Sequence, residues 1–334
     1  MVVTLAIALP LAGAACASST PKATPTVRIQ SDTPAAGPFL LAQFDDGVGA
    51  ISESEPATVW HEAAAVAALD GSAVFTVAHD QAEDSDRLER LDPRTGAVVS
   101  EWPLSTRGLE VGAVAPAGRW VALTDRHAGY GSQGRTLTKL VVFDPESGLE
   151  VKRIDLIGDV QPEAFSVDGR FVFALNYSTD HYRVQTIEIL TGERYDTADR
   201  DKALPPENME GHAVHGVMSA DHTLLATLYR NPGDAEEPAF VHVIDLTHGW
   251  SYCADLPEPF GTGPQGSDAI ELTRNGTVLV AANTSVRLAE IRIDDVRTPV
   301  GPVHVTYRPG TIPPRFPPIK SIAGFAFVIA PIAE

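Results

Sequence analysis

The 334-residue sequence has few cysteines and fewer basic than acidic residues. Its two cysteines, Cys16 and Cys253, are far apart, so they form no disulfide framework and lack the spacing of metal ligands. Aspartate and glutamate number 44 against 25 lysines and arginines, which gives a net charge of −19. A charge of this sign argues against nucleic acid and anionic lipid as direct partners. The 44% of hydrophobic residues is nevertheless enough to build a large core.

The signatures of several common catalytic and nucleotide-binding sites are also missing. The sequence contains no Gly-x-Ser-x-Gly, no P-loop, no His-Glu-x-x-His and no EF-hand loop. We therefore predict no cofactor and no resident metal, and we assign no catalytic residue.

The N-terminal residues predict an exported protein. Residues 1–16 form an apolar stretch of signal-peptide length, with small residues before Cys16, and the stretch is too short for a resident transmembrane helix. The run Leu-Ala-Gly-Ala-Ala-Cys at positions 11–16 resembles a bacterial lipoprotein signal, of a kind common in actinobacteria. The resemblance implies lipidation of Cys16 and membrane contact through the lipid anchor only. Ordinary secretory cleavage near this cysteine is the alternative, and it would release a secreted protein.

Residues 17–38 are rich in Ser, Thr, Pro and Ala and contain almost no large apolar residue. Such a segment buries too little surface to offset the entropy lost on ordering, so it predicts a flexible tether. We assign residues 39–334 to one domain.

A repeat of about 50 residues runs through this domain. Its opening turns are Asp70-Gly71-Ser72, Ala117-Gly118-Arg119, Asp168-Gly169-Arg170, Asp221-His222-Thr223 and Asn275-Gly276-Thr277. An apolar strand follows each turn, and after a loop comes a second strand, which in four of the five units ends in a turn with glycine. A period of this size with four short strands per unit is typical of β-propeller blades, so we predict an all-β fold.

The apolar pattern of the strands agrees with this fold. Strands such as LVVF and FVFAL are continuously apolar, which indicates burial on both faces, as stacked blades provide. A βαβ fold would require crossover helices with a 3.6-residue period, and the Gly-, Asp- and Pro-rich loops show none.

Two segments carry a resemblance to known families. Residues 165–172, FSVDGRFV, and residues 91–96, LDPRTG, resemble the blade motifs of WD-repeat-like, YVTN and quinoprotein-type β-propellers. The resemblance implies four-stranded antiparallel blades. Five units are explicit, and residues 39–60 would form a further blade that the run at 321–328 completes. Six blades are therefore predicted, with seven as the alternative.

In such propellers ligands bind at the mouth of the central channel. We transfer this expectation by alignment to the polar residues that precede the opening turns. The seven candidate ligand-binding residues are His61, Glu62, Glu110, Gln161, Glu163, His215 and Asp268. Clustered carboxylates would attract a cation, a sugar or a basic peptide. A water-filled channel whose lining only satisfies hydrogen bonds is the alternative. His212 and His215 have an odd offset, which on a regular strand places them on opposite faces and argues against a joint metal site.

These features favour a non-catalytic binding or scaffolding module at the outer face of the cytoplasmic membrane. The expected partner is another envelope protein or a small extracellular ligand. The alternatives are an extracytoplasmic enzyme of quinoprotein or lactonase type that uses the channel mouth, and a truncated inactive copy.

Overall fold

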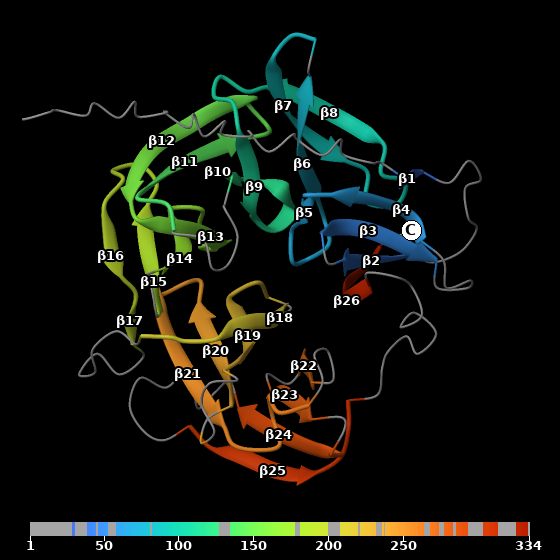
Figure 1. Cartoon of the computed structure of the whole chain (residues 1–334), viewed down its shortest axis with the longest axis vertical. Coiled ribbons are helices and arrows are strands. Elements are labelled where there is room, and N and C mark those ends of the chain that lie inside the picture. The colour runs from blue at the N-terminus through green and yellow to red at the C-terminus, as the bar shows by residue number, and fades with distance from the viewer. Residues whose placement is uncertain are drawn as a thin grey trace, which may run out of the picture.

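Figure 1 shows the computed structural model of the chain, in which small sheets are arranged around a central axis. The structure describes residues 29–30, 39–44, 46–52, 58–80, 82–126, 134–177, 181–199, 208–219, 221–231, 236, 238–263, 268–273, 277–282, 285–292, 303–312 and 325–332. Cys16 and most of the predicted tether lie outside the described residues. None of the described residues belongs to a helix that is long and apolar enough to cross a membrane.

Six sheets, antiparallel except for one short parallel pair in the fifth, form the blades, which we number from 1 to 6 in chain order. Blade 1 contains β1 (Ile29–Gln30), β2 (Phe39–Phe44), β3 (Gly47–Ser52), β4 (Thr58–Ala63) and β26 (Phe325–Ile332). Blade 2 contains β5 (Val66–Ala67), β6 (Val74–Asp80), β7 (Ser85–Leu91) and β8 (Val98–Pro103). Blade 3 contains β9 (Leu109–Val114), β10 (Val121–Asp125), β11 (Leu137–Asp144) and β12 (Leu149–Ile157), with one turn of 3-10 helix, η1 (Pro116–Gly118), between β9 and β10.

The other three blades follow the same plan. Blade 4 contains β13 (Asp159–Phe165), β14 (Phe171–Tyr177), β15 (Tyr182–Glu188) and β16 (Arg194–Asp196). Blade 5 contains β17 (Ala198–Asp199), β18 (His212–Met218), β19 (Leu224–Arg230), β20 (Ala239–Asp245) and β21 (Trp250–Leu256). Blade 6 contains β22 (Asp268–Leu272), β23 (Thr277–Ala282), β24 (Arg287–Arg292) and β25 (Val305–Pro309). The described strands thus form a six-bladed β-propeller, which confirms the predicted fold class.

Blade 1 is built from both ends of the chain. Its strand order is β1-β4-β3-β2-β26, and β26 pairs antiparallel with β2, with Phe39 opposite Ile332 and Phe44 opposite Phe325. The C-terminal run therefore completes the blade that begins at residue 39, as predicted, and it closes the ring at six blades.

The hydrophobic core lies between the blades. One cluster joins Ala122, Leu140 and Val142 of blade 3 to Val172 and Ile187 of blade 4. Other clusters join blades 1 and 2, 2 and 3, 4 and 5, and 5 and 6 in the same way. In blades 2 to 5 the central strands pack on neighbouring blades with both faces, so a continuously apolar strand is the form that this architecture requires there.

Three tryptophans pack against turn glycines of the next blade. A Cβ atom at Gly96 would lie 2.8 Å from the ring of Trp60, one at Gly148 would lie 3.0 Å from that of Trp102, and one at Gly169 would lie 2.2 Å from that of Trp120. All three glycines have positive φ, so the same residue provides the turn conformation and admits the ring.

Two blades carry a fifth strand on their outer edge. β1 pairs with β4 of blade 1, and β17 pairs parallel with β21 of blade 5. β1 lies within the segment predicted as a tether, and it shows that the outer edge of a blade accepts an additional extended segment.

Candidate functional sites in the central channel and on the outer rim

The inner strands of blades 3, 4 and 5 each contain one β-bulge, and β26, the inner strand of blade 1, has two register shifts against β2. Gly112 in β9, Glu163 in β13 and Val214 in β18 each stand opposite no residue of the neighbouring strand, so the register shifts by one. A bulge changes the direction of the side chains that follow it, and bulges occur preferentially where a strand positions a functional group. Gly112 and Glu163 both line the cavity described below.

The bulge directs the Glu163 carboxylate into the interface between blades 4 and 5. Tyr229 on β19 donates a hydrogen bond to Glu163 Oε1 over 3.4 Å, and the hydroxyl of Thr227 also faces the carboxylate. The second oxygen, Oε2, is buried and has no hydrogen-bond partner among the described residues. Burial raises the pKa of Glu163 to about 7, an effect that the two hydroxyl groups only partly oppose.

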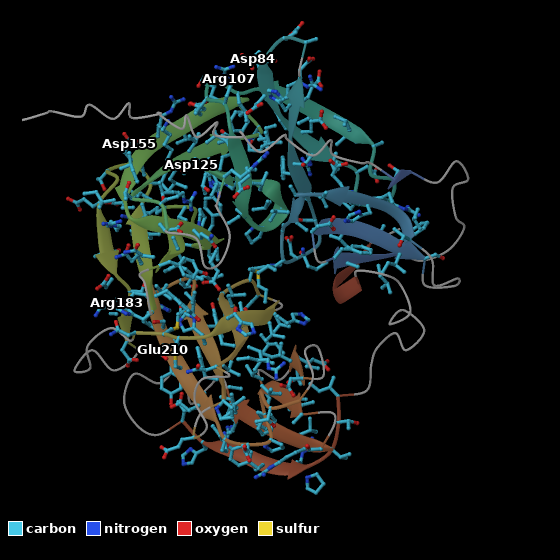
Figure 2. All side chains as sticks on the ribbon, in the orientation of Figure 1. Asp84, Arg107, Asp125, Asp155, Arg183 and Glu210 are labelled. Atoms are coloured by element: carbon cyan, nitrogen blue, oxygen red, sulfur yellow. The ribbon has the colours of Figure 1, made fainter. Side chains whose placement is uncertain are left out.

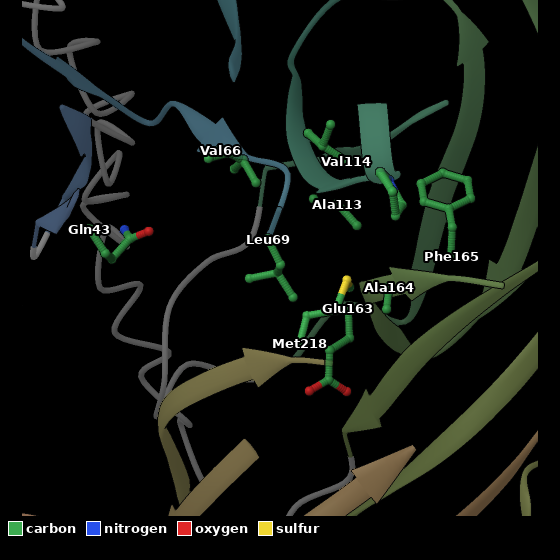
Figure 3. Close-up of a pocket in the computed structure, with 12 residues that line it drawn as sticks. Gln43, Val66, Leu69, Ala113, Val114, Glu163, Ala164, Phe165 and Met218 are labelled. Carbon is green, nitrogen blue, oxygen red and sulfur yellow. The ribbon is translucent and has the colours of Figure 1, made fainter. Parts of the chain in front are cut away.

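A cavity of about 120 Å³ lies in the central channel beside Glu163. Strands β2, β5, β9, β13 and β18, from five different blades, contribute to its lining (Figure 3). Most of the lining is apolar and includes Val66, Leu69 and Met218, while the polar side chains are those of Gln43 and Glu163. In Figure 3 the Glu163 carboxylate points away from the Val66 and Leu69 side chains, and its Oε2 atom is buried.

The other predicted residues of the inner strands do not line this cavity. Glu110 on β9 is 3.9 Å from Arg126 Nε, and Gln161 on β13 lies opposite Leu175. Asp268 on β22 accepts a hydrogen bond from the Gly261 N–H over 2.9 Å, and burial raises its pKa. Of the seven predicted residues, the structure therefore places one, Glu163, in the cavity.

Two of the seven predicted residues lie away from the channel. His61 and Glu62 belong to β4, which is three strands removed from β26 in blade 1. Their expected position on an inner strand is wrong, because blade 1 takes its inner strand from the C-terminus and β4 is consequently an outer strand. His61 lies 2.9 Å from Asp46, and Glu62 is buried.

The bulge at Val214 also overturns the expected orientation of His212 and His215. His212 lies opposite Arg230 and His215 opposite Leu228, so both side chains are on the same face of the sheet. Burial lowers the pKa of His215 to about 4, so this side chain is neutral at physiological pH. Within the described ranges, no three His, Cys, Asp or Glu side chains are grouped so that they could hold a metal ion.

The outer rim of blades 3 and 4 carries exposed apolar side chains. We define the rim surface as Leu149, Val151 and Ile157 of β12, Leu137 of β11, Leu190 in the turn after β15, and Tyr195 of β16. Ile157 is 74% exposed and Leu190 is 70% exposed. Lys152 donates a hydrogen bond to Leu190 O and Arg194 donates one to Ile157 O, so the two blades meet along this surface.

Among the described strands, β12 is the longest, with nine residues, and none of the others pairs with its outer edge. A register shift at Val151 interrupts β12, so Leu149 and Ile157 lie on opposite faces of the sheet. The exposed side chains of the strand include Asp155, which lies at the periphery of the molecule in Figure 2. A long edge strand with apolar side chains is a template for pairing with another chain.

Comparison with known proteins identifies no family. No family model matches the chain, and no curated protein matches its sequence. Among solved structures, Kuenenia stuttgartiensis hydrazine synthase is similar at 14% identity, with 91% of this chain and 88% of that chain covered and a TM-score of 0.44. TolB from Acinetobacter baumannii is similar at 13% identity, with 82% and 64% covered and a TM-score of 0.37. A complex of KlAtg21 with the coiled coil of AgAtg16 is similar at 11% identity, with 86% and 82% covered and a TM-score of 0.46.

Proposed function

We propose that this protein is a non-catalytic binding module of the cell envelope that pairs with an extended segment of a partner protein along the outer edge of blade 3. The rim surface is the observation that supports this function. Exposed apolar side chains gathered on one part of a soluble domain mark interaction sites, whereas single exposed apolar residues need no explanation.

The chain itself provides two precedents for this mode of binding. β1 and β17 are short extended segments that pair with the outer strands of blades 1 and 5. β12 offers a longer edge than either of these outer strands. Main-chain hydrogen bonds to such an edge provide affinity, and contacts at alternate side chains provide specificity.

The side chains of β12 indicate what the partner segment should contain. Leu149, Val151 and Ile157 are exposed on the strand, and Arg153 and Asp155 lie between them. Burial of Leu149 and Ile157 against a partner would contribute about 1.5–3 kcal/mol each before the entropic cost of binding. We therefore expect an extended segment with apolar residues next to Leu149, Val151 and Ile157.

The envelope location rests on the N-terminal sequence. Residues 1–16 have the pattern of a signal peptide, and a lipid on Cys16 would hold the propeller at the outer face of the cytoplasmic membrane. The part of residues 17–38 that precedes β1 would then separate the propeller from the lipid surface, which the net charge of −19 disfavours as a direct contact.

Site-specific photocrosslinking in the native cell tests this function. A photoreactive amino acid is placed at Val151 or Ile157 of β12, and the control position is Val167, an exposed valine in the turn before β14. We expect one and the same protein to crosslink from both β12 positions, through an extended segment, and not from Val167. Equal crosslinking from all three positions, or crosslinking from Val167 alone, would contradict the proposal.

A further inference from the structure

The backbone of β12 defines which of its hydrogen-bonding groups face outwards. The Gly158 N–H, directly after the strand, donates to Thr136 O over 2.9 Å, so Gly158 faces β11. Hydrogen-bonded and non-hydrogen-bonded pairs alternate along an antiparallel ladder, and the pairing of β12 with β11 is regular beyond its register shift. The N–H and C=O groups of Arg153, Asp155 and Ile157 therefore point away from β11.

Two opposite charges follow each other on one face of β12. Arg153 and Asp155 are exposed, and Asp155 lies at the periphery of the molecule in Figure 2. They stand opposite Val141 and Lys139 of β11, which lie two positions apart, so their side chains share a face of the sheet. Arg153 pairs with Glu150 of its own strand, and a guanidinium group has five N–H donors, enough for a second carboxylate.

A second copy of β12 complements this arrangement. Two identical strands that pair antiparallel are related by a two-fold axis, and each contact occurs twice. The outward groups belong to odd-numbered residues, so the axis passes through a residue rather than between two. An axis at position 153 sets Arg153 against its own copy, and an axis at position 155 does the same with Asp155. An axis at Ile154 sets Arg153 opposite Asp155 of the second copy.

We propose that the partner at the outer edge of blade 3 is a second copy of this chain, paired antiparallel through β12 about a two-fold axis at Ile154. This inference rests on the proposed function, because it names the partner of the same edge. An Arg153–Asp155 pair then forms on each side of the axis, next to main-chain hydrogen bonds between the same residues. Val151 comes next to Ile157 of the second copy at each end, which adds an apolar contact.

The contact is short, so the dimer dissociates on dilution. Arg194 of blade 4 already donates to Ile157 O, which confines the new main-chain hydrogen bonds to the centre of the strand. The net charge of −19 also opposes the association of two copies. Salt at physiological strength screens charges that are more than about 8 Å apart, whereas paired charges in contact are screened much less. The local charge pattern therefore decides the register.

Sedimentation equilibrium of the full chain at physiological ionic strength tests the proposal. We expect a monomer–dimer equilibrium of the unaltered chain. Arg153→Asp and Asp155→Arg should each weaken dimerisation about 10- to 100-fold, because each change sets like charges opposite each other on both sides of the axis. An equal mixture of the two variants should dimerise as the unaltered chain does, since opposite charges face each other again in the heterodimer.

Arg170→Asp is the matched control. It makes the same change of charge as Arg153→Asp at an exposed position outside β12, and it should dimerise as the unaltered chain does. A chain that stays monomeric up to about 1 mM, the range of weak association, would overturn the second copy as the partner. Dimerisation that survives both single changes would overturn it as well.

Photocrosslinking from β12 in the cell separates this inference from the proposed function. If the second copy is the partner, the product crosslinked from Val151 should contain two copies of this chain. A product that contains a different protein would overturn the present inference and leave the outer edge of blade 3 as the binding site. The absence of any product from both Val151 and Ile157 would contradict the proposed function itself.

Discussion

Replacement of Arg135 by alanine should lower the free energy of unfolding by about 3–5 kcal/mol, the cost of leaving buried charges without their partner. The Arg135 side chain is 9% exposed and its partner Asp159 is 4% exposed. Its Nε donates to Asp159 Oδ1 over 2.9 Å, and its two terminal nitrogens donate to Thr124 Oγ1 and Val160 O, each over 3.1 Å. Arg135 thus joins the end of β10 in blade 3 to the start of β13 in blade 4.

Urea unfolding followed by circular dichroism measures this effect. Arg170→Ala provides the control, because the Arg170 side chain is 60% exposed and its pair with Glu188 is largely solvated. An exposed ion pair of this kind contributes about 0–1 kcal/mol. If Arg135→Ala were as stable as Arg170→Ala, Arg135 would not hold blades 3 and 4 together in the manner described.

Replacement of Trp60 by alanine should remove about 3–5 kcal/mol, as is typical of a large aromatic side chain that leaves a cavity in a core. Trp60 is fully buried in the cluster between blades 1 and 2. Its indole N–H donates to Pro93 O over 3.0 Å, and its ring packs against Gly96 in the same turn of blade 2. Trp60 therefore stabilises the contact between blade 2 and blade 1, the blade that contains both ends of the chain.

Trp60→Phe separates packing from hydrogen bonding at this position. It retains an aromatic ring and removes the hydrogen bond to the partly buried Pro93 carbonyl, and a hydrogen bond of this kind contributes about 0.5–1.5 kcal/mol. The same unfolding experiment should order the stabilities as unaltered chain, Trp60→Phe and Trp60→Ala. Equal stability of the alanine variant and the unaltered chain would contradict the packing described for blades 1 and 2.

The fold could be predicted because the sequence patterns that indicate it, such as the turns between strands, are local. In the turn before β14, Ser166 Oγ accepts a hydrogen bond from the Phe171 N–H and donates one to Asp168 Oδ1. Ser219 and Asp221 repeat these bonds before β19. Each turn also holds a residue with positive φ, Gly169 in one and His222 in the other. Because hydrogen bonds of this kind depend on a few neighbouring residues, such turns can be recognised in the sequence.

The channel site was predictable only in part, because bulges and ring closure are not local. Glu163 was among the predicted residues, yet its position in the cavity depends on the extra residue in β13, which the alternation of the sequence does not reveal. The same cause reversed the relation of His212 to His215. His61 and Glu62 were misplaced because the inner strand of their blade comes from the other end of the chain.

Other residues of the cavity and of the rim surface could not be predicted from the sequence. Gln43 lines the cavity from blade 1. Its position there depends on how the blades meet at the axis. The exposure of Leu149 and Ile157 depends on which strand ends a sheet, because an apolar residue in a propeller strand is ordinarily buried by the next blade. Neither the position of Gln43 nor the exposure of Leu149 and Ile157 can be inferred from the sequence of one repeat.

Amide hydrogen exchange of the full chain, alone and with the partner captured from β12, tests the central claim most directly. If an extended segment pairs with blade 3, the amides of β12 should exchange more slowly in the complex, since pairing protects backbone N–H groups. Those of β25, an outer strand of blade 6, should exchange at unchanged rates. Slower exchange in other parts of the propeller, with β12 unaffected, would show that the partner binds elsewhere and would contradict the proposed edge.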